Sequence, residues 1–154
     1  VDGPADPLYC FGHGLSYTSF QLSDLALSGD EVPTDGVVEV SCKVQNTGPV
    51  EGDEVVQLYT SFFGAHVIRP VMELRGFKRV TLAPGEEKSV KFRLNTAQMG
   101  DYNDNMNFVV EPGDLTVQVG TSSKDLPLQR KIELVGKAVD VMGKRAYTCP
   151  AEVC

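Results

Sequence analysis

Hydrophobic and polar residues alternate along much of this chain, with the period of two that is typical of β-strands. The clearest case is residues 38–45, where one face carries only apolar side chains and the other only polar ones: Val38, Val40, Cys42 and Val44 against Glu39, Ser41, Lys43 and Gln45. Such alternation predicts an antiparallel strand with one face in the core. Further strands are expected at residues 54–60, 72–82, 90–94, 108–110, 115–119 and 132–134.

Proline and glycine mark the connections between these strands. Ala83-Pro84-Gly85-Glu86 and Glu111-Pro112-Gly113-Asp114 place them at the central positions of a type II turn. Within residues 72–82, Gly76 predicts a bulge or a change of sheet. Residues 95–104 are expected to be a polar connection, and no segment shows a convincing helical period. We predict an all-β, antiparallel sandwich of about seven strands, of the immunoglobulin or fibronectin type III kind.

Residues 9–20 concentrate aromatic rings and glycines near the N-terminus, in Tyr9, Phe11, Gly12, Gly14, Tyr17 and Phe20. Rings of this size need a surface to pack against, and glycine permits backbone conformations or close approaches that a side chain would block. The run is therefore expected to be a connector between two domains.

Composition narrows the range of partners. Of 154 residues, 42% are hydrophobic, which suffices for one domain with an ordinary core. The net charge of −7 argues against nucleic acid and against an anionic membrane surface. No stretch approaches the roughly 20 apolar residues of a membrane span. The sequence leaves open whether the protein is cytoplasmic or secreted.

The candidate metal and thiol sites are weak. The cysteines form no C-x-x-C pair, Cys42 is expected to be a buried thiol, and Cys149 and Cys154 are candidates for a disulfide across a short loop. Residues 101–112 resemble a calcium loop only at their first positions, since Met106 and Pro112 replace the glycine and the bidentate glutamate. We expect a polar turn there, with no metal and no cofactor.

Candidate catalytic groups are equally weak. Glycoside hydrolysis requires two carboxyl groups flanking a sugar-sized cleft, whereas Asp53-Glu54 and Glu86-Glu87 are expected to be solvated loop carboxylates. His13 and His66 have no G-x-S-x-G partner motif and are expected to be structural or surface residues. Phe62 and Phe63 are candidates for stacking on sugar rings, although contact with another domain is the favoured interpretation.

Several segments together resemble one family: Phe11-Gly12-His13-Gly14-Leu15-Ser16-Tyr17-Thr18, Asn46-Thr47-Gly48, residues 52–59, Arg69-Pro70, residues 73–80, residues 109–113 and Val119-Gly120-Thr121-Ser122. In this order and at these spacings they resemble the C-terminal fibronectin type III-like domain of glycoside hydrolase family 3, the multidomain β-glucosidases and β-xylosidases. The resemblance covers roughly residues 7–134.

The resemblance implies that other domains of the same enzyme carry out catalysis. In that family a (β/α)-barrel domain carries the catalytic aspartate nucleophile, and an α/β sandwich domain commonly contributes the acid/base region. The resemblance therefore implies that this chain alone is not an enzyme and carries no catalytic residue. It is expected to stabilise the catalytic domains and to help shape the rim of their cleft, so that β-linked oligosaccharide is an indirect partner.

Three segments are expected: an interdomain connector at residues 1–18, a sandwich at 19–136, and a C-terminal tail of unassigned role at 137–154. The connector is the expected junction with a missing α/β domain. Arg69 and Glu73 flank Pro70, where a charged pair would pin the loop or reach the neighbouring domain. The residues expected at the interdomain contact are Phe11, His13, Leu15, Tyr17, Arg69 and Glu73.

Two alternatives remain open at this stage. The sandwich is either a carbohydrate-binding module that uses Phe62, Phe63 or other exposed rings, or an independent adhesion-like module. The choice between glucose and xylose belongs to the domains that hold the substrate pocket.

Overall fold

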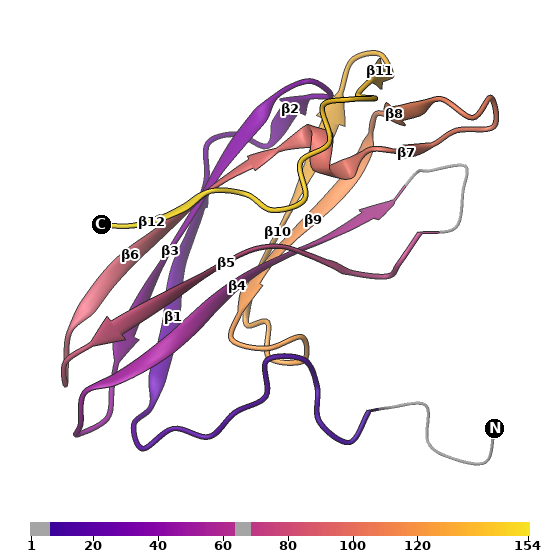
Figure 1. Ribbon diagram of the computed structural model, residues 1–154. Coiled ribbons are helices and arrows are strands. Elements are labelled where there is room, and N and C mark those ends of the chain that lie inside the picture. Colours follow the sequence, from indigo (N-terminus) through magenta and orange to yellow (C-terminus); the bar gives the residue numbers. More distant parts are fainter. Residues whose placement is uncertain (1–6, 64–68) are drawn as a thin grey trace.

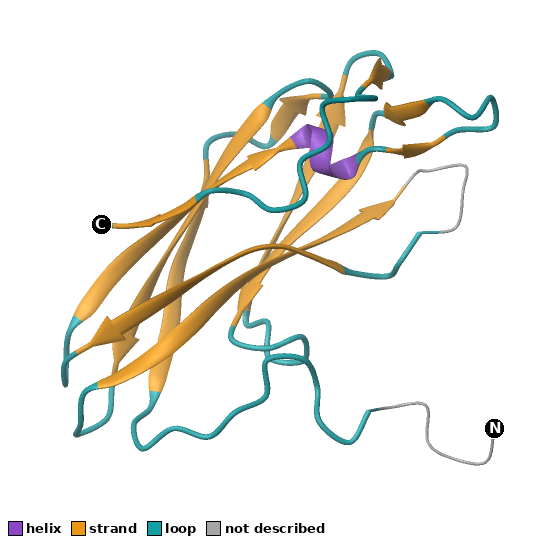
Figure 2. Ribbon diagram, viewed as in Figure 1, coloured by secondary structure: helices purple, strands orange, loops and turns teal. Residues whose placement is uncertain are grey.

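The computed structural model describes residues 7–63 and 69–154, and almost all of their regular structure is β-strand (Figures 1 and 2). The seven expected strands form, as do five shorter or irregular ones, so the described residues contain twelve strands instead of about seven. In chain order the elements are β1 (Phe20–Leu27), β2 (Glu31–Pro33), β3 (Val37–Asn46), β4 (Gly52–Phe63), β5 (Glu73–Leu82), β6 (Glu87–Asn95), the 3₁₀-helix η1 (Thr96–Met99), β7 (Asp101–Tyr102), β8 (Phe108–Val110), β9 (Gly113–Gly120), β10 (Leu128–Val135), β11 (Val139–Asp140) and β12 (Ala151–Val153).

Two sheets pack face to face, which confirms the predicted sandwich (Figure 1). One has the strand order β1-β3-β6-β12, and the other has the order β2-β10-β9-β4-β5. A small sheet, β11-β8-β7, lies at one end. Pairing is antiparallel except between β2 and β10, which are parallel. Within the described residues, no helix is long and apolar enough to cross a membrane.

The alternation along β3 builds the core as expected. Its apolar face is buried throughout, at Val38, Val40, Cys42 and Val44. β3 pairs with β6 in a register that sets Val40 opposite Phe92, the largest fully buried side chain. Glu39, Ser41, Lys43 and Gln45 lie on the other face, so the period of two translates directly into burial.

The irregular strand β1 shows why some strands escape prediction. Its register against β3 shifts between Ser23 and Ala26, and Asp24 between them has a φ of 55°. A bulge of this kind interrupts the alternation of facing side chains. The other four additional strands have only two or three residues each, too few for a period to be read.

The predicted turns and bulge are confirmed in part. Gly85 has a φ of 76° and Glu86 N donates to Ala83 O at 3.0 Å, as in the expected turn. The second expected turn does not form, because Gly113 is the first residue of β9. Gly113 is closely packed there, since a Cβ added to it would lie 2.7 Å from Phe63 O. At Gly76 the register between β4 and β5 shifts, which is the predicted bulge.

The expected polar connection at residues 95–104 contains the buried helix η1, whose four residues all lie in the interior. The Asn95 side chain caps it by accepting a hydrogen bond from Ala97 N at 2.8 Å. The polar turn that follows is organised by Asn103, whose side-chain oxygen accepts hydrogen bonds from Asn105 N and Asn107 N, each at 3.0 Å. Side chains of this type stabilise turns in this way.

The C-terminal residues pack onto the sandwich. β12 extends the first sheet by pairing with β6, with Ala151 opposite Phe92. Cys149 is buried beneath Gly76, and its backbone N donates to Arg75 O at 2.7 Å. Cys149 and Cys154 are both free thiols in the structure, so the expected disulfide is not formed. Cys149 is buried and Cys154 is exposed.

The four thiols are expected to react in two classes. Burial raises the pKa of Cys42 and of Cys149 to about 11, and only the thiolate is a good nucleophile. At pH 8 a thiol reagent should therefore modify the exposed Cys154 and the half-exposed Cys10 quickly. Cys42 and Cys149 should react only after unfolding in urea, and fast modification of all four in the native protein would contradict this packing.

Candidate functional site

Residues 7–18 cross one end of the sandwich and are attached to it by a backbone hydrogen bond at Phe11 and a side-chain hydrogen bond at Thr18 (Figure 1). Ser123 N, in the β9–β10 loop, donates to Phe11 O at 2.9 Å. Gly12 has a φ of 84° and lies so close to the Gln57 side chain that a Cβ would clash with it, so this position requires glycine. The segment is therefore attached to the domain.

The far end of the segment is fixed by a buried asparagine. Asn46 is fully buried, and its side-chain oxygen accepts a hydrogen bond from Thr18 Oγ1 at 2.6 Å. Its side-chain nitrogen donates to Val50 O at 2.7 Å and to Leu82 O at 2.9 Å. Satisfying a buried amide in this way avoids a desolvation cost of about 1–3 kcal/mol.

The apolar side chains of the segment are largely exposed. Leu15 and Tyr17 are 97% and 98% exposed, and Phe11 is 67% exposed. His13 stacks on Tyr9 with 5.0 Å between the ring centroids. Contiguous apolar exposure of this kind marks an interaction surface. The four residues predicted for an interdomain contact in this run are thus brought together on one segment.

A cavity of about 450 Å³ lies between this segment and the sheet. Its apolar wall includes Phe11 and Leu15 from the segment and Leu74 and Phe77 from β5. Phe77 is itself exposed. The backbone attachment of the segment therefore leaves an apolar hollow beside the exposed rings.

The polar wall of the cavity comes from the start of β4. Asp53 pairs with the guanidinium of Arg79 and accepts a hydrogen bond from Thr81. Among the described residues, Glu54 accepts its one side-chain hydrogen bond from Val55 N, at 2.8 Å. Burial raises the pKa of the Glu54 carboxyl above its usual range. Glu54 is half-buried in a strand, which corrects the expectation of a solvated loop carboxylate.

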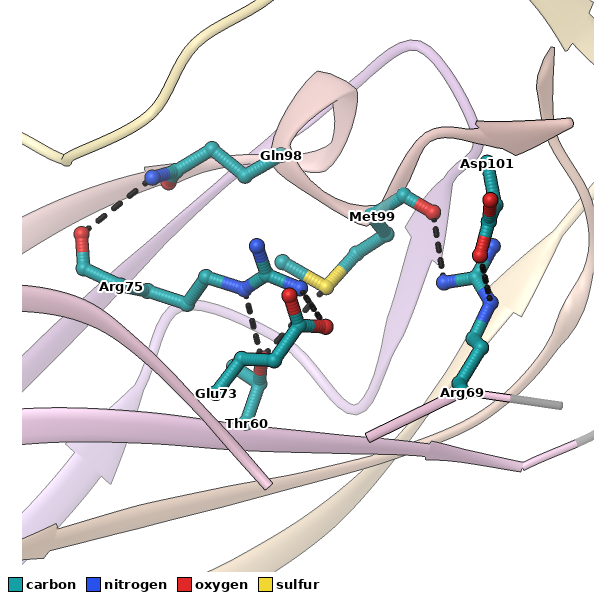
Figure 3. A network of polar contacts seen from close by, with 7 residues as sticks. All are labelled: Thr60, Arg69, Glu73, Arg75, Gln98, Met99 and Asp101. Carbon is teal, nitrogen blue, oxygen red and sulfur yellow. Dashed lines mark hydrogen bonds and ion pairs between the residues drawn. The ribbon is translucent and has the colours of Figure 1, made fainter. Parts of the chain in front are cut away.

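A second polar cluster joins β4, β5 and η1 (Figure 3). The Arg75 side chain is buried, and its Nε donates to Thr60 Oγ1 at 3.0 Å. Its Nη2 lies 2.5 Å from Glu73 Oε2, and its carbonyl oxygen accepts a hydrogen bond from Gln98 Nε2 at 3.2 Å. Burial lowers the pKa of Arg75, and the charge of Glu73 partly offsets this effect.

Arg69 belongs to the same region and is tied to its own domain. Its Nη1 donates to Met99 O at 2.8 Å, and its Nε forms an ion pair with Asp101 Oδ2 at 3.3 Å (Figure 3). Its guanidinium also lies over the Phe62 ring, 4.7 Å from the centroid. The ion pairs of Arg69 and Glu73 are therefore formed with Asp101 and Arg75, and an interdomain role for the two residues stays a prediction.

The rings of Phe62 and Phe63 do not lie side by side. They are consecutive residues of β4, so their side chains leave opposite faces of the strand. Phe62 is half-buried beneath Arg69, whereas Phe63 is exposed. A paired stacking platform for sugars is therefore not formed, and a carbohydrate contact by either ring stays a prediction.

Sequence reasoning missed Arg75, Asp101 and the role of Glu54. Arg75 is the extra residue of the bulge beside Gly76, which turns an otherwise solvent-facing position inward. The only signal for Glu54 was its place immediately before the apolar run of β4.

Substituting Gly120 by alanine is expected to disturb the loop that supports the segment. A Cβ at Gly120 would lie 2.8 Å from Leu126 Cα and would clash with the Asp125 carbonyl, both backbone groups. Overpacking of this kind costs about 1–3 kcal/mol. Urea unfolding should show this loss for Gly120→Ala. Gly14→Ala is the control, because a Cβ there meets nothing within 4 Å; equal midpoints for the two variants would refute the argument.

Comparison with known proteins assigns the fold to a class. Residues 54–123 match the family model of the fibronectin type III-like domain. A solved structure of a β-glucosidase from Listeria innocua in complex with glucose superposes with a TM-score of 0.81 at 37% identity, covering 90% of this chain and 19% of that one. The chain is therefore built on a fibronectin type III-like domain.

The relatives place this domain in one family. Thermostable beta-glucosidase B of Acetivibrio thermocellus is 41% identical over 130 residues, which is 84% of this chain and 17% of that protein. A beta-xylosidase of Formosa agariphila is 47% identical over 118 residues, which is 77% of this chain and 16% of that protein. The chain thus matches the fibronectin type III-like part of family 3 glycoside hydrolases, and it spans less than a fifth of the length of these relatives.

Proposed function

We propose that the chain acts as a non-catalytic, C-terminal accessory domain of a family 3 β-glucosidase or β-xylosidase. In this role it stabilises the catalytic domains, which act on β-linked gluco- or xylo-oligosaccharides, and it helps shape the rim of their cleft. The observation that carries the proposal is the coverage: more than three quarters of this chain matches about a sixth of each of these hydrolases.

The exposed segment supports a role in domain association. Leu15 and Tyr17 present nearly their whole apolar surface, and the segment that carries them is attached to the sandwich on either side, at Phe11 and at Thr18. Covering such surface contributes about 25 cal/mol per Å² of apolar area. In this proposal residues 1–18 are an interdomain connector. Residues 7–18, the part that the structure describes, also form one rim of the candidate docking surface.

The first test is enzymatic. The 154-residue chain alone should show no turnover of aryl β-glucosides or β-xylosides. The complete polypeptide encoded by the gene should hydrolyse one of the two substrate types, and deletion of residues 19–154 from it should lower its thermal midpoint. Activity of the isolated chain, or an unchanged midpoint after the deletion, would contradict the proposal.

A further inference from the structure

Two charged side chains line the cavity beside residues 7–18, Asp53 and Glu54, and among the described residues only Asp53 has a cationic partner. Asp53 uses both of its oxygens within the domain, on Arg79 and Thr81. The Gln57 side chain is engaged at both ends: its Nε2 donates to Thr121 O at 2.6 Å, and its Oε1 accepts from Tyr59 OH at 2.7 Å.

Glu54 differs from these neighbours. Its single hydrogen bond comes from the adjacent Val55 N, and the hydrogen bonds and ion pairs of the described residues give it no cationic partner. The negative charge of Asp125 also raises the pKa of Glu54, because it disfavours the ionised form of that carboxyl group. A half-buried carboxylate in this setting is stabilised most by a positive charge brought to it.

We propose that this cavity receives one basic side chain, an arginine or a lysine, from the catalytic part of the same hydrolase, with its charged end on Glu54. The aliphatic stem of such a residue packs against Phe11, Leu15 and Phe77, which line the hollow. Long basic side chains combine an apolar stem with a charged head. The inference rests on the proposed function and names the chemistry of its partner.

A sugar fits the same cavity less well. A pyranose ring carries several hydroxyl groups, and each one that is buried without a partner costs free energy. Among the polar side chains of the cavity lining, Asp53, Gln57 and Thr121 are occupied, which leaves the Glu54 carboxylate and the Ser16 hydroxyl. Its exposed rim is also apolar, at Leu15 and Phe77, which is typical of a surface that another protein domain covers.

The experiment measures hydrogen exchange of residues 12–17 in the complete polypeptide and in the 154-residue chain. Exchange in the wild-type complete polypeptide should be at least tenfold slower than in the chain. Glu54→Gln, which keeps the shape and removes the charge, should cancel most of this protection. Glu54→Lys should abolish it, because two cations then face each other. The control is Glu51→Gln, an exposed carboxylate just before β4.

The outcomes separate this inference from the proposed function. Wild-type protection that is lost in Glu54→Gln and Glu54→Lys but kept in Glu51→Gln supports both. Protection that survives both changes at Glu54 overturns the basic partner and leaves domain association standing. Absence of protection in the wild type overturns both. Thermal midpoints of the chain variants serve as the folding check, and a midpoint of Glu54→Gln matching that of Glu51→Gln excludes a trivial loss of structure.

Discussion

Phe92→Ala is expected to lower the free energy of unfolding by about 3–5 kcal/mol, the range typical of removing a fully buried aromatic ring. Phe92 lies at the middle of β6, between Val40 of β3 and Ala151 of β12. It also faces the second sheet, since its Cδ1 would lie 3.2 Å from a Cβ placed on Gly76. Its removal therefore leaves a cavity between the sheets that neighbouring strands cannot fill.

The matched control is Arg93→Ala. Arg93 is the next residue of β6 and its side chain is exposed on the opposite face. Its change should alter stability by no more than about 0.5 kcal/mol. Urea unfolding of the two variants and the wild type gives the comparison, and a loss of less than 1 kcal/mol in Phe92→Ala would show that this ring is not the centre of the core.

Ending the chain after residue 148 is expected to lower stability by about 3 kcal/mol, roughly what full burial of one or two apolar side chains contributes. The truncation removes the buried Cys149 and the whole of β12. It also removes the paired hydrogen bonds between Ser89 and Cys154, of 3.0 and 2.8 Å. β6 then becomes an open edge, and such edges promote aggregation.

The control for the truncation is Glu152→Ala, which changes an exposed side chain of β12 and leaves its backbone in place. It should unfold close to the wild type and elute at the wild-type volume in size-exclusion chromatography. A truncated chain that unfolds at the wild-type midpoint would mean that residues 149–154 are a dispensable tail.

The sequence predicted the sandwich and its main strands because burial follows the period of two wherever a strand is regular. β3 and β6 are the plain cases, with alternate residues such as Val40 and Phe92 buried to the same depth. β1 was missed because the bulge at Asp24 breaks that period. β12 was missed because its partner, β6, lies about sixty residues earlier in the chain, and a long-range pairing leaves no local signal.

Only the exposed apolar segment of the candidate site could be predicted from the sequence. The aromatic and glycine-rich run around Phe11 marked the exposed segment. The pairings of Arg69 with Asp101 and of Arg75 with Glu73 depend on how β5 and the residues after η1 meet in space. The same holds for Glu54, whose importance comes from Asp53 and Gln57 being occupied by partners distant in sequence.

The central claim is that this domain docks on the catalytic part of a hydrolase through residues 7–18 and the cavity beside them. Its most direct test is to produce the catalytic part and the 154-residue chain as separate polypeptides and to measure their association by light scattering after size-exclusion chromatography. We predict a one-to-one complex that is weakened by replacing Leu15 and Tyr17 with serine. Separate elution of the two wild-type parts, with no change in the mass of either, would contradict the account.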